Sequence, residues 1–276
     1  MEKRTAASAP SVVIMEMITS ADGTRIAFDQ LGSGPPLVLV SGAMCGRRAD
    51  EAIATALADR FTVLNYDRRG RGDSGDIVPY AVEREIEDLA AMLDAAGASA
   101  VVVGISSGGA LVLLAAAAGV PIRAAMGWEV PYRTDDEGRR SSATYRSRTE
   151  ELLADGRRGE AVALFLRTVG VPDRAIEGMQ RSPFWAEGEK IAPTLAYDAA
   201  VLDDAAVPVD RLATITCPTA LFTGGASPPL FATAADAAVA ALPDGTHRVL
   251  DGQIHDVDPG ALADAVAAFV EERLRS

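Results

Sequence analysis

Short apolar runs rich in valine and leucine alternate with helix-like segments along most of this 276-residue chain. Runs such as "PPLVLVSG" (35–42) and "SAVVVG" (99–104) are continuously apolar, which is typical of strands buried on both faces of a sheet. Between them, "VEREIEDLAAMLDAAG" (82–97) has its apolar residues at helical spacing and ends at glycine. This alternation of strands and helices predicts a mostly parallel sheet flanked by helices, an α/β fold.

The pattern changes over residues 131–205, which carry more charge, contain no clear strand and look helical. Strand–helix alternation resumes at "CPTALFTGG" (217–225) and continues to a final helix at 261–274. We therefore predict a core domain formed by residues 1–130 and 206–276, and a helical cap formed by residues 131–205.

Composition excludes several classes of protein. Hydrophobic residues make up 49% of the chain, enough for a sizeable core, and the net charge of −13 argues against a nucleic-acid binder. The two cysteines, Cys45 and Cys217, cannot form a disulfide framework and match no metal motif. No apolar run reaches the roughly 18 residues that a membrane span needs. We expect a cytoplasmic protein with no nucleic-acid or membrane partner, in which residues 1–17 form a flexible tail before the first strand; the sequence leaves a homodimer open.

One tight corner of the chain carries the signature of a nucleophile. Residues 104–108, "GISSG", fit the pattern G-x-S-x-G between a predicted strand and an apolar helix. Such a turn lifts the serine hydroxyl above the sheet, at the N-terminus of a helix with free N–H groups. The register of the motif selects Ser106 as the nucleophile and leaves Ser107 to offer its backbone N–H. The Gly42–Ala43 turn ends another strand at the same edge, so we expect the Ala43 N–H to be the second donor to an oxyanion.

A serine hydroxyl needs a base, and the chain has two histidines. His247 precedes the predicted strand "RVLDG" and is expected at the surface. His255 follows that strand, on a loop at the carboxyl edge of the sheet, where it could reach Ser106. The chain order, serine first and histidine late, also favours His255.

Four motifs, in this order along the chain, resemble those of the α/β-hydrolase family: "VLVSGAM" (38–44), "YDRRGRGDSG" (66–75), "GISSGG" (104–109) and "GQIHDV" (252–257). The resemblance implies an eight-stranded, mostly parallel sheet with a helical cap insertion and a Ser–His–acid triad. Ser41 stands where members often have histidine. The turn that contains Asp67 and Arg69 is structural in the family, so we expect these two residues to brace the loop as a pair.

The acid of the triad is not at its usual position. In most relatives it follows the seventh strand, where this chain has Ser227, and a serine cannot supply the charge that stabilises an imidazolium. Glu129, just beyond the predicted sixth strand, is the favoured candidate, and certain haloalkane dehalogenases are similar in this respect. Asp251, and Asp256 and Asp258 on the histidine's own loop, stay open as alternatives, as does a triad without an acid.

These features predict a cofactor-free serine hydrolase without a metal, acting on an ester, lactone or thioester of a small, mostly apolar molecule through an acyl-enzyme. The residues expected to contact the substrate are Met44, Trp128, Tyr132 and Trp185. The unusual acid and Ser41 leave a second hypothesis: a cyclase, lyase or C–C bond-cleaving enzyme with His255 as general base. The third hypothesis is a small-molecule receptor that has lost catalysis.

Overall fold

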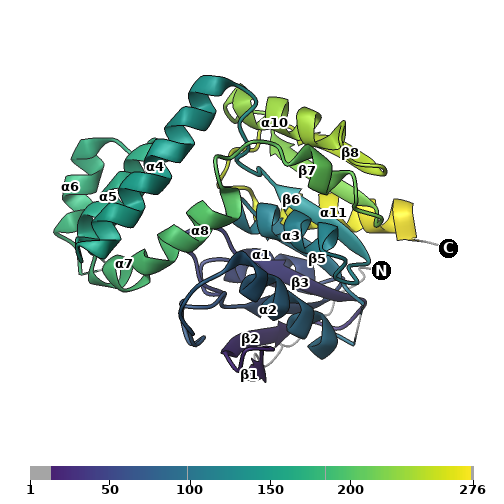
Figure 1. Ribbon diagram of the computed structural model, residues 1–276. Helices are drawn as coiled ribbons and strands as arrows, with labels where there is room; N and C mark the ends of the chain where they lie inside the picture. Colours follow the sequence, from purple (N-terminus) through teal and green to yellow (C-terminus); the bar gives the residue numbers. More distant parts are fainter. Residues whose placement is uncertain (1–13, 98, 184, 275–276) are drawn as a thin grey trace, which may run out of the picture.

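The computed structural model describes residues 14–97, 99–183 and 185–274. Within them, eight strands form one sheet in the order β1-β2-β4-β3-β5-β6-β7-β8 (Figure 1). The strands are β1 (Ile14–Thr19), β2 (Arg25–Leu31), β3 (Pro36–Val40), β4 (Thr62–Tyr66), β5 (Val101–Ile105), β6 (Ala124–Trp128), β7 (Thr219–Gly224) and β8 (Gly245–Leu250). The β1–β2 and β2–β4 pairs are antiparallel and the others are parallel, so the predicted sheet is confirmed.

Side chains of the central strands alternate between two apolar layers, which explains their continuous hydrophobic runs. In β5, Val102 faces the layer under α2, α3, α9 and α10, whereas Val101 and Val103 face the layer under α1 and α11. These helices are α1 (Glu51–Ala58), α2 (Val82–Ala95), α3 (Ser107–Ala117), α9 (Val209–Leu212), α10 (Pro229–Val239) and α11 (Pro259–Leu274). The sheet is therefore covered on both faces, and its strand ends are left to carry a site.

A group of helices lies between β6 and β7 in the chain and to one side of the sheet (Figure 1). It consists of α4 (Asp136–Ala154), α5 (Arg158–Thr168), α6 (Asp173–Gln180), α7 (Trp185–Ile191), a 3₁₀ turn (Ala192–Thr194) and α8 (Leu195–Leu202). A bridge between Arg133 and Ala206 joins the two ends of this insertion. Figure 1 shows α8 leading from the other helices back toward the sheet.

Two expectations need correction. The sequence predicts a flexible tail over residues 1–17, but residues 14–17 belong to β1. Met17 pairs with Ala27 there because the edge of β2 offers a free hydrogen-bonding ladder. The rest of the expected tail, residues 1–13, lies outside the described part of the chain. His247 does not precede its strand but lies within β8, and its side chain is only 12% exposed. Among the described helices, none is long and apolar enough to cross a bilayer.

Candidate active site

Ser106 lies on a strained corner between β5 and α3. Its φ of 53° and ψ of −120° are values that non-glycine residues rarely adopt. Its N–H donates to the carbonyl of Trp128 at 2.8 Å, which ties the corner to the end of β6. The glycines of the motif make the corner possible: a Cβ at Gly104 would lie 2.4 Å from the Gly108 carbonyl oxygen, and one at Gly108 would lie 2.4 Å from that of Val40. The neighbouring backbone thus excludes larger residues.

Glu129 and His255 meet at the carboxyl ends of β6, β7 and β8. Glu129 directly follows β6, and the 2.8 Å contact between its Oε2 and His255 Nδ1 is a hydrogen bond. The N–H of Gly224, at the end of the adjacent parallel strand β7, donates to the other carboxylate oxygen at 2.9 Å. The Glu129 side chain is fully buried, whereas that of His255 is 50% exposed. A buried carboxylate therefore holds an accessible imidazole.

The charge of Glu129 determines how the imidazole is protonated. Burial by itself would raise the pKa of Glu129, but hydrogen bonds, first that from His255, lower it below its ordinary value of 4.5. An ionised carboxylate only accepts hydrogen bonds, so Nδ1 carries a proton, and in the neutral ring Nε2 is then the acceptor. The His255 loop is fixed further by Trp128, whose Nε1 donates to the His255 carbonyl at 3.0 Å, and by Phe231, whose ring centroid lies 5.5 Å from that of the imidazole.

Ser106, the third residue of the predicted Ser–His–acid triad, lies near Glu129 but is not hydrogen-bonded to Glu129 or His255 among the described residues. Ser106 and Glu129 follow the ends of the neighbouring strands β5 and β6. In the described part of the chain, however, no hydrogen bond links the Ser106 hydroxyl to the His255 ring. In ligand-free enzymes such bonds are often long and tighten only when the substrate binds.

Both predicted oxyanion donors lie next to Ser106. Ser107 is the first residue of α3, and a Cβ at Gly42, which precedes Ala43, would come within 3.3 Å of the Ser106 Cβ. Among the described residues, neither the Ala43 N–H nor the Ser107 N–H donates to a protein acceptor. The two N–H groups are thus available to an oxygen that develops negative charge.

The comparisons with known proteins concern the family and the fold. A model described as "Alpha/beta hydrolase family" matches residues 37–265. The chain belongs to the α/β-hydrolase family. An α/β hydrolase from Sphaerobacter thermophilus DSM 20745 is 47% identical, over 92% of this chain and 99% of that chain, with a TM-score of 0.83.

Two solved esterases share the fold at lower identity. A thermophilic esterase from Thermogutta terrifontis is 23% identical, over 95% of this chain and 98% of that chain, with a TM-score of 0.67. An esterase from Exiguobacterium antarcticum is 16% identical, over 94% of this chain and 100% of that chain, with a TM-score of 0.72.

In this α/β hydrolase the alternative carboxylates lie elsewhere. Asp258 caps α11, because its Oδ1 accepts from the Ala261 N–H at 2.8 Å. Asp251 and Asp256 are exposed, and within the described ranges only Glu129 is hydrogen-bonded to the His255 ring. Among those same residues, no group of three or more His, Cys, Asp or Glu side chains is arranged to hold a metal ion.

Two of the four expected substrate contacts do not fit the structure. Trp128 is 0% exposed and packs in the same apolar cluster as Met126 and Phe222. Tyr132 is 3% exposed and packs in the cluster on the other face of the sheet. Side chains closed off from solvent offer no surface to a substrate, so the expectation is wrong for both. Trp128 instead supports the His255 loop, a role that its position just before Glu129 does not reveal.

Of the other two expected substrate contacts, Met44 lies beside the helical insertion, and Trp185 belongs to it as the first residue of α7. Met44 lines a cavity of about 490 Å³ between the loop after β3, the turn after β4 and α7. Nearly half of its lining residues are charged: Arg47, Arg48, Asp67, Asp73, Glu187 and Lys190. Trp185 is half-buried, with its Nε1 beside Gly159 of α5. Ser106, Glu129 and His255 do not line this cavity, so it adjoins the loop of the site without containing the reactive groups.

The turn after β4 is braced, but not by the expected pair. Asp67 accepts from the Arg47 backbone N–H at 2.7 Å and forms an ion pair with the Arg47 guanidinium. Arg69 instead forms two hydrogen bonds of 2.7 Å with Asp88. The interpretation of Asp67 and Arg69 as one pair is therefore wrong, although each residue holds the turn in place. Arg68 and Arg71, the other two arginines of this turn, are completely buried, which nothing in their local sequence indicates.

Proposed function

We propose that this α/β hydrolase is a serine hydrolase that cleaves an ester, lactone or thioester of a small molecule through an acyl-enzyme. The observation that supports the proposal most is the 2.8 Å hydrogen bond between Glu129 and His255, next to the strained corner at Ser106. The bond orients an imidazole with a free Nε2 at the edge of the sheet where the serine hydroxyl lies.

In the proposed reaction, the Ser106 Oγ attacks the carbonyl carbon while His255 Nε2 takes the hydroxyl proton. The N–H groups of Ala43 and Ser107 stabilise the oxyanion. Glu129 stabilises the imidazolium, which then gives its proton to the leaving oxygen or sulfur. A water molecule, deprotonated by His255, attacks the acyl-enzyme in the same way and releases the acid and Ser106.

We propose a mostly apolar substrate because an aromatic ring, that of Phe231, lies against the accessible imidazole, and exposed apolar residues adjoin both rings in the chain. Leu230 and Ile254, neighbours in the chain of Phe231 and His255, are 37% and 51% exposed. The Phe231 ring against the imidazole offers apolar surface on which an acyl or alkyl group would be removed from water.

The test combines a covalent probe with a substrate panel. A fluorophosphonate should label the wild-type protein at Ser106 and leave Ser106→Ala unlabelled, and p-nitrophenyl esters or lactones should be turned over by the wild type alone. A folded wild type that resists the probe and hydrolyses no ester would refute the proposal.

A second function has one observation in its favour: His255 is half exposed and not hydrogen-bonded to Ser106 among the described residues. A lyase, cyclase or C–C bond-cleaving enzyme could use His255 as general base with Ser106 only positioning the substrate. Comparing turnover by Ser106→Ala and His255→Ala distinguishes the two. The hydrolase needs both residues, whereas the alternative depends on the histidine.

A further inference from the structure

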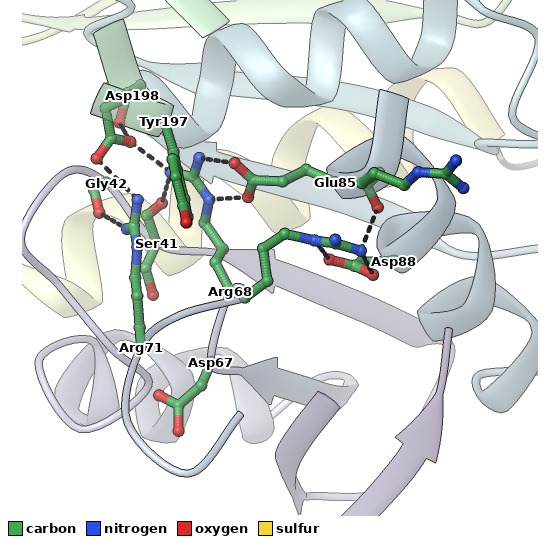
Figure 2. A network of polar contacts seen from close by, with 12 residues as sticks. Ser41, Gly42, Asp67, Arg68, Arg71, Glu85, Asp88, Tyr197 and Asp198 are labelled. Atoms are coloured by element: carbon green, nitrogen blue, oxygen red, sulfur yellow. Dashed lines mark hydrogen bonds and ion pairs between the residues drawn. The ribbon is translucent and has the colours of Figure 1, made fainter. Parts of the chain in front are cut away.

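A buried network of charges connects α8 of the helical insertion to the loop after β3 (Figure 2). Arg68 and Arg71 come from the turn after β4, and both form hydrogen bonds with Asp198 of α8, at 2.7 and 2.8 Å. The other side of the Arg68 guanidinium is paired with Glu85 at 2.6 and 2.7 Å. All four side chains are buried, so the network is shielded from water.

The two arginines also hold the backbone of the loop that carries Ala43. Arg71 Nη1 donates to the Gly42 carbonyl at 2.5 Å and to the Cys45 carbonyl at 3.2 Å. Arg68 Nη1 donates to the Ser41 carbonyl at 3.3 Å. Figure 2 shows Arg71 lying between the Gly42 carbonyl and the Asp198 carboxylate. The carbonyls of Gly42 and Cys45, which flank Ala43 in the chain, are therefore held pointing toward Arg71.

This arrangement determines the direction of one N–H group. In a trans peptide, the C=O of one residue and the N–H of the next point to opposite sides. Because the Gly42 carbonyl faces Arg71, the Ala43 N–H points away from the guanidinium. If the peptide turned over, a carbonyl oxygen would replace the donor and repel an oxyanion. The direction of the Gly42–Ala43 peptide therefore decides whether an oxyanion site exists.

Asp198 contacts the second donor residue as well. The Ser107 hydroxyl donates to Asp198 Oδ1 at 2.8 Å, so one carboxylate joins Arg68, Arg71 and the first residue of α3. Burial alone would raise the pKa of Asp198, but the charges of Arg71 and Arg68 lower it below its ordinary value. Asp198 is thus ionised at neutral pH and can hold Arg71 in place.

We propose that Arg71 and Asp198 are positioning residues that set the oxyanion hole in advance: Asp198 orients Arg71, and Arg71 holds the Gly42 carbonyl so that the Ala43 N–H faces the reacting carbonyl. The inference rests on the proposed hydrolase function. It adds that α8 of the helical insertion controls the orientation of an oxyanion donor. Any movement of α8 that carried Asp198 away would release Arg71 and, with it, the orientation of the Gly42–Ala43 peptide.

The test compares Asp198→Asn with Asp88→Asn. Asp88 is as buried as Asp198 and holds the neighbouring Arg69, which among the described residues forms no hydrogen bond with the loop after β3. Both substitutions should lower the melting temperature, but only Asp198→Asn should lower kcat on a p-nitrophenyl ester. The expected loss is about 10²–10³-fold, the effect of losing one oxyanion donor, with KM close to that of the wild type. Equal effects of the two variants on kcat would overturn the proposal.

A second measurement reads the peptide directly and does not depend on turnover. In a spectrum that passes magnetisation through the carbonyl carbon, such as an HNCO, protein made with carbonyl-labelled glycine and nitrogen-labelled alanine gives amide signals only from Gly-Ala pairs. These pairs occur five times, at 42–43, 97–98, 109–110, 225–226 and 260–261. The Ala43 signal is assigned by its loss in Ala43→Ser. It should shift or broaden in Asp198→Asn and stay in place in Asp88→Asn. An unmoved Ala43 signal in Asp198→Asn would overturn the proposal.

The two measurements separate the failure of the inference from that of the proposed function. A wild type without esterase activity or fluorophosphonate labelling, combined with an Ala43 signal that moves in Asp198→Asn, would refute the hydrolase and leave the positioning of the loop supported. If Asp198→Asn does not fold, Arg71→Lys serves instead. A single ammonium keeps the charge beside Asp198 but lacks the planar fork that reaches a carboxylate and a carbonyl together, so the same changes in kcat and in the Ala43 signal are expected.

Discussion

The two histidines of this protein each contact a carboxylate through Nδ1, yet their surroundings differ. His255 Nδ1 is paired with Glu129 at 2.8 Å, and His247 Nδ1 with Asp236 at 2.7 Å. The other nitrogen of His247 is hydrogen-bonded to the Thr223 hydroxyl at 2.8 Å. The corresponding nitrogen of His255 is free among the described residues, and that ring is half exposed.

The exposure of the two carboxylates is the reverse of that of the histidines they contact. Glu129 is 0% exposed and also bound by a backbone N–H, whereas Asp236, on the surface of α10, is 73% exposed. Solvent weakens an exposed ion pair to little net value, while a buried carboxylate keeps its influence on the ring. A histidine beside a carboxylate is therefore not enough to indicate a catalytic site. The free nitrogen, the access of solvent and the buried acid together distinguish His255.

The largest expected effect separates the two histidines. His255→Ala should lower kcat on a p-nitrophenyl ester about 10⁵–10⁶-fold, because a serine without its base is a poor nucleophile. His247→Ala should leave kcat close to the wild-type value, since its ring is bonded on both nitrogens within the edge of the sheet. Similar losses of kcat in the two variants would show that His255 is not the only histidine on which turnover depends.

The next effect separates the two carboxylates. Glu129→Gln should lower kcat about 10⁴-fold, because an amide neither stabilises the imidazolium nor selects the tautomer with a free Nε2. Asp236→Asn is the matched control and should retain wild-type turnover. If Glu129→Gln stayed active while Asp251→Asn or Asp256→Asn lost activity, the acid would come from the histidine's own loop in the working enzyme.

The sequence predicted those parts of the fold and the site that depend on local patterns. Continuous apolar runs indicated buried strands, and the glycines around Ser106 indicated a corner where backbone segments touch. Parallel strands end at one edge, so a residue directly after β6 could be expected near one that follows β8. That reasoning, together with the resemblance to certain haloalkane dehalogenases, is why Glu129 could be proposed although the usual acid position holds Ser227.

The remaining features depend on packing that no local pattern reveals. Whether Trp128 faces a pocket or the core depends on the face of the sheet toward which the last residue of β6 points. His247 lies within β8 because residues 245–250 pair with the whole of β7. The strand begins at Gly245, a residue type that is more typical of a loop. Asp198 contacts Arg71 only because α8 packs against the turn after β4. The sequence of neither segment indicates that the two lie together.

A smaller effect concerns acid stability. The pKa of Glu129 is lower in the folded protein than its ordinary value of 4.5, so its ionised form stabilises the fold above that value. This contribution is lost as the pH falls below 4.5 and through the folded-state pKa. The difference in the free energy of unfolding between wild type and Glu129→Gln should therefore narrow in this acid range. Urea unfolding at neutral pH and at several pH values below 4.5 measures this difference in the free energy of unfolding. The contributions of the other buried carboxylates cancel in the difference because both proteins share them.

The smallest effect is a change of stability at the second histidine. Thr223→Val removes the hydroxyl that binds His247 Nε2 in a buried position and should lower the free energy of unfolding by about 1 kcal/mol. The turnover number should not change, because His247 holds the edge of the sheet rather than the substrate. Thr219→Val, on the same strand, is the control: its hydroxyl donates to the nearby Cys217 carbonyl at 3.1 Å and to no other acceptor among the described residues. A loss of kcat in Thr223→Val but not in Thr219→Val would mean that this hydroxyl supports Gly224 and, through it, Glu129. The two histidines would then belong to one connected structure, and the contrast between them would be one of distance from the substrate rather than of role.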